Sequence, residues 1–199
     1  MRDKIIFATS NEGKMKEIRM ILKDYNIQSM KEAGIDIDIV EDGSTFEENA
    51  IIKAKTIMEM TGKVVLADDS GLEVDALDKA PGIYSARFLG KDTSYEIKNN
   101  YILDKLKDVP WEKRSARFVC VIACALPEGE IFTTKATIEG FIGYEIKGKN
   151  GFGYDPIFWV PEYECTSAEL TPEIKNKISH RGKALEKMKV LLDNRLQFK

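Results

Sequence analysis

The chain has 199 residues, of which 43% are hydrophobic and 32% are charged, and its formal net charge is -3. This is the size of one large domain or of two small lobes, with enough apolar material for a core. Because the charges are interspersed and the balance is acidic, polymeric nucleic acid is excluded as an expected partner, although a local pocket can still attract small anions.

Three cysteines and a single histidine limit the chemistry further. An odd number of cysteines without tight pairing predicts reduced thiols and a cytoplasmic protein. Cys120 and Cys124 lie an even number of residues apart in an apolar run, so we expect both in the core on one side of a sheet. One histidine rules out a zinc-type cluster. The N-terminal segment is too polar for a signal peptide, and the longest apolar run is too short to cross a membrane.

The first half of the chain reads as two strand–helix pairs. KIIFA (4–8) predicts a buried strand, TSNEG a loop, and the apolar spacing from Lys14 onward a helix. A second helix begins near Thr45, which forms a capping-box pattern with Glu48. VVLA (64–67) then predicts a strand that ends before two adjacent carboxylates.

The second half mixes the two periodicities. SYEIKNNYILDKLKDV (94–109) predicts a helix, and two long β-rich runs around PEGE (127–130) predict a hairpin. DPIFWVP (155–161) predicts a short strand, Pro172 the start of a helix, and KALEKMKVLLDNRL (183–196) a final helix. The antiparallel hairpin among these elements predicts one compact α/β protein with a mixed sheet.

The loop TSNEGK, Thr9–Lys14, carries hydroxyls, an amide, a glycine and an ammonium at a predicted helix start. Backbone N–H groups at such a position attract phosphate. A simple helix cap with a solvated lysine is the alternative. The loop lacks the second glycine of a Walker A motif. GYEIKGKN (143–150) comes closer to that motif, but Asn150 replaces the hydroxyl and no apolar helix follows, so we reject it as a nucleotide loop.

Asp68 and Asp69 are adjacent acids at the predicted strand end. Their mutual repulsion requires compensation, and a divalent cation lying among them would provide it, because magnesium uses one or two carboxylates plus substrate phosphates. Further acids that could reach the ion are Glu41, Glu47 and Glu48. An Asx-turn with solvated acids is the alternative. A phosphatase of the haloacid dehalogenase type fits poorly, because its signature is Asp-x-Asp.

Other residues could complete a nucleotide site. Lys53 lies away from the apolar stripe of its helix and could reach a phosphate, although a solvated lysine is the alternative. GKNGFGYDP (148–156) combines permissive glycines with aromatics that could stack on a base, or it is a turn with two core aromatics. His180 and Arg181 offer donors suited to a ring carbonyl, although a lone histidine is often structural.

Together, these segments resemble the inosine triphosphate pyrophosphatase family, the non-canonical purine nucleoside triphosphate (dITP/XTP) pyrophosphatases. The blocks that carry the resemblance run in order along nearly the whole chain: FATSNEGKMKEI, TFEENAIIKAK, LADDSGLEVDAL, PGIYSARF, RFVCVIA, GFGYDPIFWVP and AELTPEIKNKISHRGKAL. The resemblance implies an α/β fold with an elongated mixed β-sheet flanked by helices, and two lobes with the active-site cleft between them. It also implies that residues 1–199 form a single pyrophosphatase domain.

The same resemblance implies a cytoplasmic, magnesium-dependent homodimer that converts ITP, dITP or XTP to the monophosphate and pyrophosphate. By matching position, Asp69 is the general base and a Mg²⁺ ligand, and Glu41 is the second ligand. Lys14 and Lys53 are expected to neutralise phosphate charge during catalysis. The implied substrate-binding residues are Thr9, Ser10, Asn11, Glu12, Gly13, Lys14, Ser70, Phe152, Gly153, Tyr154, Asp155, Lys175, His180 and Arg181.

Two other functions fit the sequence less well. A nucleotide-binding regulatory module without turnover would be expected to lack the acids or Lys14, and both are present. A pyrophosphatase for pyrimidine or modified nucleotides would need a different base pocket. Donors from His180 or Arg181 would pair with a 6-oxo group, whereas they would face the amino group of adenine donor to donor.

Overall fold

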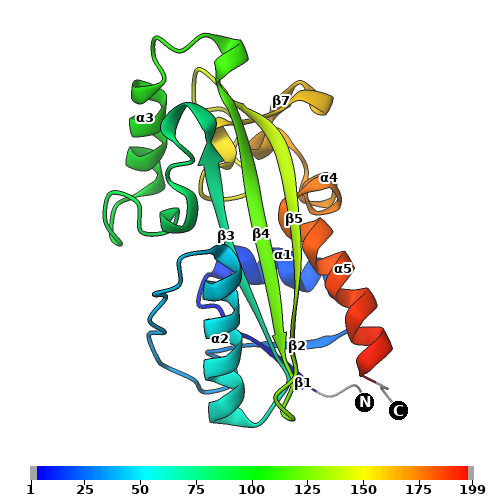
Figure 1. Cartoon of the computed structure of the whole chain (residues 1–199). Coiled ribbons are helices and arrows are strands. Elements are labelled where there is room, and N and C mark those ends of the chain that lie inside the picture. The colour runs from blue at the N-terminus through cyan, green and yellow to red at the C-terminus, as the bar shows by residue number, and fades with distance from the viewer. Residues whose placement is uncertain (1–3, 197–199) are drawn as a thin grey trace. The chain divides into compact units, whose positions relative to one another are not determined.

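The computed structural model describes residues 4–196, and within them the chain has an α/β fold (Figure 1). The strands are β1 (Lys4–Phe7), β2 (Asn26–Ser29), β3 (Val65–Val74), β4 (Ser115–Ala125), β5 (Ile131–Ile142), β6 (Phe158–Val160) and β7 (Cys165–Thr166). The helices are α1 (Glu12–Ile21), α2 (Phe46–Thr61), α3 (Tyr95–Lys105), α4 (Pro172–Ile178) and α5 (His180–Arg195).

The strands form one sheet in the order β2-β1-β3-β4-β5-β6-β7. β1 is parallel to β2 and β3, whereas β6 is antiparallel to β5 and β7, so the predicted mixed sheet is confirmed. The predicted hairpin is also confirmed, because residues 127–130 connect β4 to β5.

The chain divides into two compact units. Unit 1 comprises the chain up to Asp69, the segment Cys120–Ala136, and the chain from His180 onward. Unit 2 comprises Ser70–Val119 and Thr137–Ser179. Strands β3, β4 and β5 contribute residues to both units, so Asp69 and Ser70 are neighbours in β3 but belong to different units.

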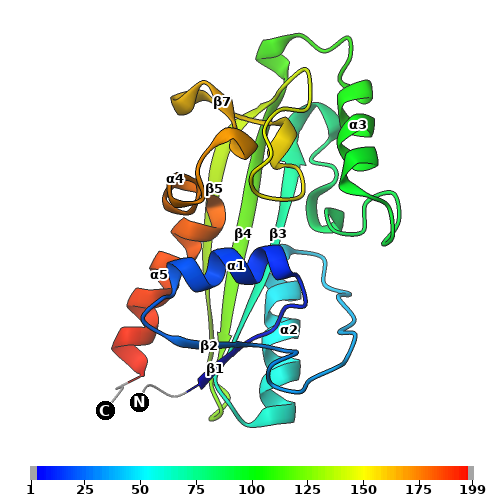
Figure 2. The same cartoon turned by 180° about the vertical axis from the view of Figure 1, so that it is seen from behind.

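Unit 1 is organised around β1. From β1 the chain passes through α1 to β2 on one side, and then through α2 to β3 on the other. Helices α1 and α5 cover one face of these strands and α2 covers the other, as Figure 1 and Figure 2 show from opposite sides. Ligands of open parallel sheets bind at the carboxyl end of the strand where the connections diverge in this way. The loop that begins at Thr9 follows β1 at that position.

The face of unit 1 under α1 and α5 contains a large hydrophobic cluster. Ile5 and Phe7 of β1 and Leu66 of β3 pack there against apolar residues of both helices. Cys120 and Cys124 of β4 belong to the same cluster, and both are free thiols, as predicted. Residues two apart in a strand point to the same face, so alternate residues of each strand pack into this cluster.

The structure corrects two local predictions and adds one strand that was not predicted. The strand predicted to end before Asp68 continues through both acids to Val74. Helix α5 begins at His180, earlier than the apolar pattern indicated. Strand β2 was not predicted, because its four residues are only partly buried and show no clear alternation.

The start of α2 is confirmed in part. Thr45 is the N-cap, and its side chain accepts a hydrogen bond from the backbone N–H of Glu48. The carboxylate of Glu48 accepts from the backbone N–H and the hydroxyl of Ser44, at 2.6 and 2.7 Å, instead of completing the capping box.

Because β3 continues, Asp68 and Asp69 point to opposite faces of the sheet. Asp68 lies on the face of α1 and α5, where Lys14 and Arg181 bind it. Asp69 lies on the face of α2, where Lys53 binds it. The expectation that one cation lies among both acids is therefore wrong: each carboxylate has its own partners.

Asp68 is the centre of a buried charge cluster. Its Oδ2 accepts hydrogen bonds from Arg181 Nε at 2.9 Å and from the Cys120 thiol at 3.1 Å, while Oδ1 binds the Lys14 ammonium. Arg181 Nη1 also binds Glu17 at 2.5 Å. Two carboxylates and two cations are thus balanced. Burial would raise the pKa of Asp68, but Arg181 and Lys14 outweigh it and hold that pKa well below its usual range.

Unit 2 has its own core. Leu72 and Val74 of β3 pack with Ile102 of α3, and further apolar residues come from β4, β5 and β6. The rejected segment 143–150 is a loop in which the backbone N–H groups of Lys149 and Asn150 bind the carbonyl of Ala168, and no helix follows it directly. Across residues 4–196, none of the helices combines the length and apolarity required to span a membrane.

We predict that Asp68→Asn destabilises the protein by about 3–5 kcal/mol, because breaking a buried ion pair leaves its cations without a counter-charge. Urea unfolding at pH 7 measures the change. The wild-type contribution is present above about pH 4 and is lost as the pH falls below it, because the folded-state pKa lies under the unfolded one. Asp24→Asn is the matched control, since the exposed Asp24–Lys189 pair is worth at most about 1 kcal/mol. Equal effects of the two substitutions would contradict the prediction.

Candidate functional site

The loop from Thr9 to Lys14 is a self-supporting turn into α1. Asn11 is the N-cap, and its Oδ1 accepts from the backbone N–H of Lys14 at 3.0 Å. The Thr9 hydroxyl accepts from the backbone N–H of Asn11 at 3.2 Å. The predicted helix start is confirmed, and the loop lies at the divergence of the β1 connections. Phosphate binding by Ser10, Gly13 and the rest of the loop stays a prediction.

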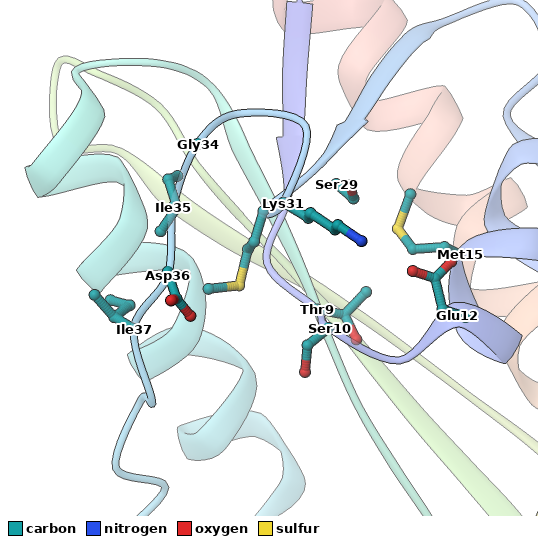
Figure 3. Close-up of a pocket in the computed structure, with 11 residues that line it drawn as sticks. Thr9, Ser10, Glu12, Met15, Ser29, Lys31, Gly34, Ile35, Asp36 and Ile37 are labelled. Atoms are coloured by element: carbon teal, nitrogen blue, oxygen red, sulfur yellow. The ribbon is translucent and has the colours of Figure 1, made fainter.

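A cavity of about 480 Å³ lies beside this loop in unit 1, between the residues that follow β1 and those that follow β2 (Figure 3). Three predicted site residues, Thr9, Ser10 and Glu12, line it. The remaining lining residues, which were not predicted, are Met15, Ser29, Met30, Lys31, Gly34, Ile35, Asp36 and Ile37. The cavity therefore lies on the β2 side of the Thr9–Lys14 loop, and Asp69 does not line it.

Asp69, Lys53 and Glu41 form the second charged cluster of unit 1, the carboxylate centre. The ammonium of Lys53 binds Asp69 Oδ1 at 2.8 Å and Glu41 Oε2 at 3.1 Å. Lys53 is 8% exposed and Asp69 is 6% exposed, so neither is the solvated residue that the alternative readings required. Two predicted metal ligands and a predicted phosphate-binding lysine are thus brought together.

The carboxylate centre is not balanced in charge. Burial raises the pKa of Asp69 to about 6; Lys53 and Lys14 work against this shift, and the nearby Glu41 adds to it. Burial also opposes ionisation of Glu41, but Lys53 prevails and lowers the pKa of that carboxyl. At neutral pH the two carboxylates and one ammonium carry one net negative charge. A hard cation is suited to such a site.

One oxygen of the centre has no partner. Among residues 4–196, Asp69 Oδ2 is buried and takes part in no hydrogen bond. A buried carboxylate oxygen without a donor is costly unless a ligand binds it. Over the same residues, no group of three or more acidic, cysteine or histidine side chains could hold a metal. Two carboxylates fit magnesium, which completes its shell with water and substrate phosphate oxygens.

The other candidate acids are occupied elsewhere. Glu47 accepts a hydrogen bond from the Thr133 hydroxyl at 2.5 Å, and Glu48 binds Ser44. Asp68 is neutralised by Lys14 and Arg181. Of the candidate acids, Asp69 and Glu41 are thus the two that belong to the carboxylate centre.

Unit 2 contains another predicted cluster. Asp155 Oδ2 accepts from the backbone N–H of Phe152 at 2.8 Å and from Lys175 at 2.5 Å, and Lys175 lies 5.0 Å above the Phe152 ring. Gly151 has φ +74°, and a Cβ there would lie 2.2 Å from Asp155 Oδ2. The turn thus needs glycine at this position. Phe152, Asp155 and Lys175 are brought together as predicted.

Tyr154 and Gly153 have supporting positions in unit 2. The Tyr154 ring is 3% exposed, meets Tyr95 edge-on at 5.3 Å, and donates its hydroxyl to the Ser85 carbonyl at 2.8 Å. The Gly153 carbonyl accepts from Asn99 at 3.1 Å. Tyr154 is therefore a core residue rather than an open stacking surface. Its predicted contact with substrate stays a prediction.

The remaining predicted residues fall on both sides of the unit boundary. His180 and Arg181 are buried in the first turn of α5 in unit 1, and Ser70 lies in the part of β3 that belongs to unit 2. Two nitrogens of Arg181 bind Asp68 and Glu17, so the structure gives this residue a role in unit 1 that was not predicted. Its role as a reader of the base stays a prediction.

The polar clusters and their surroundings include three residues that were not predicted, Glu17, Cys120 and Asn49. Glu17 follows Lys14 by three residues, and Asn49 precedes Lys53 by four, so helical spacing places each beside a predicted residue. A polar residue at a buried helix position next to a candidate is a usable signal. Cys120 offered none, because it reads as an ordinary core residue.

Comparison with known proteins places this arrangement in context. The sequence matches the Ham1 family over residues 5–191. It is 51% identical to the dITP/XTP pyrophosphatase of Exiguobacterium sibiricum over 191 residues, covering 95% of this chain and 96% of that protein. It is 52% identical to the dITP/XTP pyrophosphatase of Desulforamulus reducens, covering 97% and 96%.

Solved structures agree with this assignment. The Staphylococcus aureus Ham1 protein superimposes with a TM-score of 0.86 at 43% identity, covering 96% of this chain and 99% of that one. A Ham1 protein from Coxiella burnetii gives the same TM-score and identity, covering 96% and 98%. Sequence and fold thus agree along almost the whole chain, and the chain belongs to the Ham1 family.

Proposed function

We propose that this protein hydrolyses ITP, dITP and XTP to the nucleoside monophosphate and pyrophosphate, and so removes non-canonical purine nucleotides from the nucleotide pool. The observation that carries the proposal is the carboxylate centre. Its buried Asp69 forms an ion pair with Lys53 through Oδ1, while Oδ2 receives no hydrogen bond. The family supports the choice of substrate, because relatives about half identical to this chain carry the name dITP/XTP pyrophosphatase.

Asp69 acts in this proposal as the general base. It orients a water molecule and accepts its proton while the water oxygen attacks phosphorus, and the anhydride bond to the pyrophosphate leaving group breaks. A base with a pKa near 6 is ionised at neutral pH and still accepts a proton readily. Lys53 holds the carboxylate in place and would stabilise the negative charge that develops on the phosphates.

Glu41 and Asp69 would hold the magnesium ion, and the uncompensated negative charge of the centre supports this assignment. The bound ion would neutralise phosphate charge and assist departure of pyrophosphate. Lys14 and the backbone of the Thr9–Gly13 loop would bind the triphosphate at the start of α1. Lys14 is already bound to Asp68, which fixes its position before substrate arrives.

We further propose, on the family resemblance, that the base and sugar are bound by Phe152 to Asp155, Lys175, His180 and Arg181. Ser70 would contact the substrate next to Asp69. The protein would act in the cytoplasm as a homodimer, with residues 1–199 forming a single pyrophosphatase domain. Lysine, imidazole and guanidinium donors suit the 6-oxo group of hypoxanthine and xanthine.

The proposal predicts pyrophosphate release from ITP, dITP and XTP with Mg²⁺, and far slower release from ATP. Asp69→Asn should lower the rate by at least about 100-fold, because general-base assistance is typically worth ~10²–10⁴-fold. A coupled pyrophosphate assay measures both rates, and EDTA should abolish the activity. Asp24→Asn, an exposed acid of the same unit, serves as the control. Full activity in Asp69→Asn would show that another group is the base.

The pH dependence gives a second test. Because the pKa of Asp69 is raised to about 6, kcat/KM should be constant at neutral pH and fall about tenfold per pH unit below that pKa. The groups around Asp69 are Lys53, Lys14 and Glu41. Despite burial, Lys53 holds the pKa of Glu41 below its usual value, so we assign an inflection near pH 6 to Asp69. Higher Mg²⁺ should move the inflection to lower pH, because a cation favours the ionised carboxylate. A flat profile down to pH 5 would contradict the assignment.

A further inference from the structure

The segment from Glu41 to Thr45 is bonded along its length to the first turns of α2. The Gly43 N–H donates to Asn49 Oδ1 at 2.9 Å. Ser44 donates both its backbone N–H and its hydroxyl to Glu48. Thr45 caps the helix. These bonds fix the path of the chain immediately after Glu41.

Asn49 is an unusual residue for its position. Its side chain is completely buried in α2, where an apolar residue would have the better helix propensity and no polar atoms to satisfy. Among residues 4–196, its Nδ2 has no hydrogen-bond partner. Against the cost of that buried donor stands one hydrogen bond, in which Asn49 Oδ1 accepts from the Gly43 N–H. The bond to Gly43 is thus the structural reason for asparagine at this site.

Gly43 complements Asn49 by its close approach. A Cβ at Gly43 would lie 2.7 Å from Asn49 Oδ1, 2.8 Å from Glu48 Cβ and 3.0 Å from the Asn49 backbone nitrogen. Real Cβ atoms do not approach so closely, so a side chain here would push the segment off the helix. Glycine is required by this contact and not by its backbone conformation, since its φ is outside the left-handed region.

One face of α2 binds both Glu41 and Gly43, the two ends of the stretch 41–43. Asn49 binds Gly43, and Lys53, one helical turn later, binds Glu41 at 3.1 Å. Lys53 also binds Asp69, so the place of Glu41 relative to Asp69 depends on the path of residues 41–43. Removing the Asn49 bond would release Gly43 from α2 and loosen the segment that carries Glu41.

We propose that Asn49 is a positioning residue that acts through Gly43 to hold Glu41 beside Asp69, and so sets the affinity of the carboxylate centre for a divalent cation. This inference rests on the proposed function, in which Glu41 and Asp69 are the metal ligands. Asn49 itself would contact neither the ion nor the substrate.

The first test combines two measurements on Asn49→Ala. Hydrogen exchange, followed by mass spectrometry, should quicken in peptides covering residues 41–45, because the Gly43 amide loses its acceptor. Mn²⁺ binding, followed by electron paramagnetic resonance, should weaken by about 10-fold or more, as is typical when a residue supporting a metal ligand is removed. Asn49→Asp keeps an oxygen for the Gly43 N–H and should restore slow exchange. Asn194→Ala, an exposed helical asparagine, is the control.

A second variant covers the case in which Asn49→Ala does not fold. Gly43→Ala keeps Asn49 but displaces the segment, and it should weaken Mn²⁺ binding and raise the Mg²⁺ concentration needed for half-maximal pyrophosphate release. Gly143→Ala is its control, because a Cβ there meets only ordinary contacts at 3.7 and 3.8 Å.

The outcomes separate this inference from the proposed function. If Asp69→Asn and Glu41→Gln weaken Mn²⁺ binding while Gly43→Ala and the folded Asn49 variants bind it like wild type, the positioning role is wrong and the metal site stands. If neither Asp69→Asn nor Glu41→Gln affects Mn²⁺ binding, the proposed metal site is wrong, and the positioning role falls with it. A loss of stability in Asn49→Ala with unchanged exchange of residues 41–45 also overturns the inference.

Discussion

The arrangement of unit 1 depends on the alternation of side chains along β3. Two ionised residues in sequence would repel strongly in a buried strand if both lay on one face. Alternation directs Asp68 to α1 and α5 and Asp69 to α2, and each acid meets cations there. A single strand thus carries a balanced cluster on one face and an unbalanced one on the other. The balanced cluster supports the fold, and the unbalanced one has the net negative charge that the proposed metal site requires.

The two clusters also link the elements that the proposed chemistry requires. Lys14 belongs to the loop after β1 and is held by Asp68, while Asp69 is the next residue along the same strand. Lys14 and Asp69, the proposed phosphate-binding residue and general base, are therefore held relative to each other through β3. On the opposite face, α2 supplies Lys53 to the centre and Asn49 to the segment that carries Glu41. Preorganisation of this kind is what electrostatic catalysis requires.

Much of this could be predicted from sequence, and the remainder has a physical explanation. The helices α1 and α2, the hairpin and the mixed sheet followed from periodicity and capping residues. Asp69, Glu41 and Lys53 were identified through a family resemblance, and the structure brings them together. The end of β3 was placed too early, because two acids read as a turn when their long-range partners are unknown. Arg181 lies 113 residues from Asp68, and local patterns do not indicate a contact over such a separation.

The Cys120 thiol offers a direct view of the core around Asp68. It is completely buried and donates to that carboxylate, and burial together with the negative charge raises its pKa well above the usual value. A protonated thiol without solvent access reacts with alkylating reagents only when the surrounding structure opens. The labelling kinetics of this natural probe would therefore report the free energy of local opening in unit 1, separately from complete denaturation.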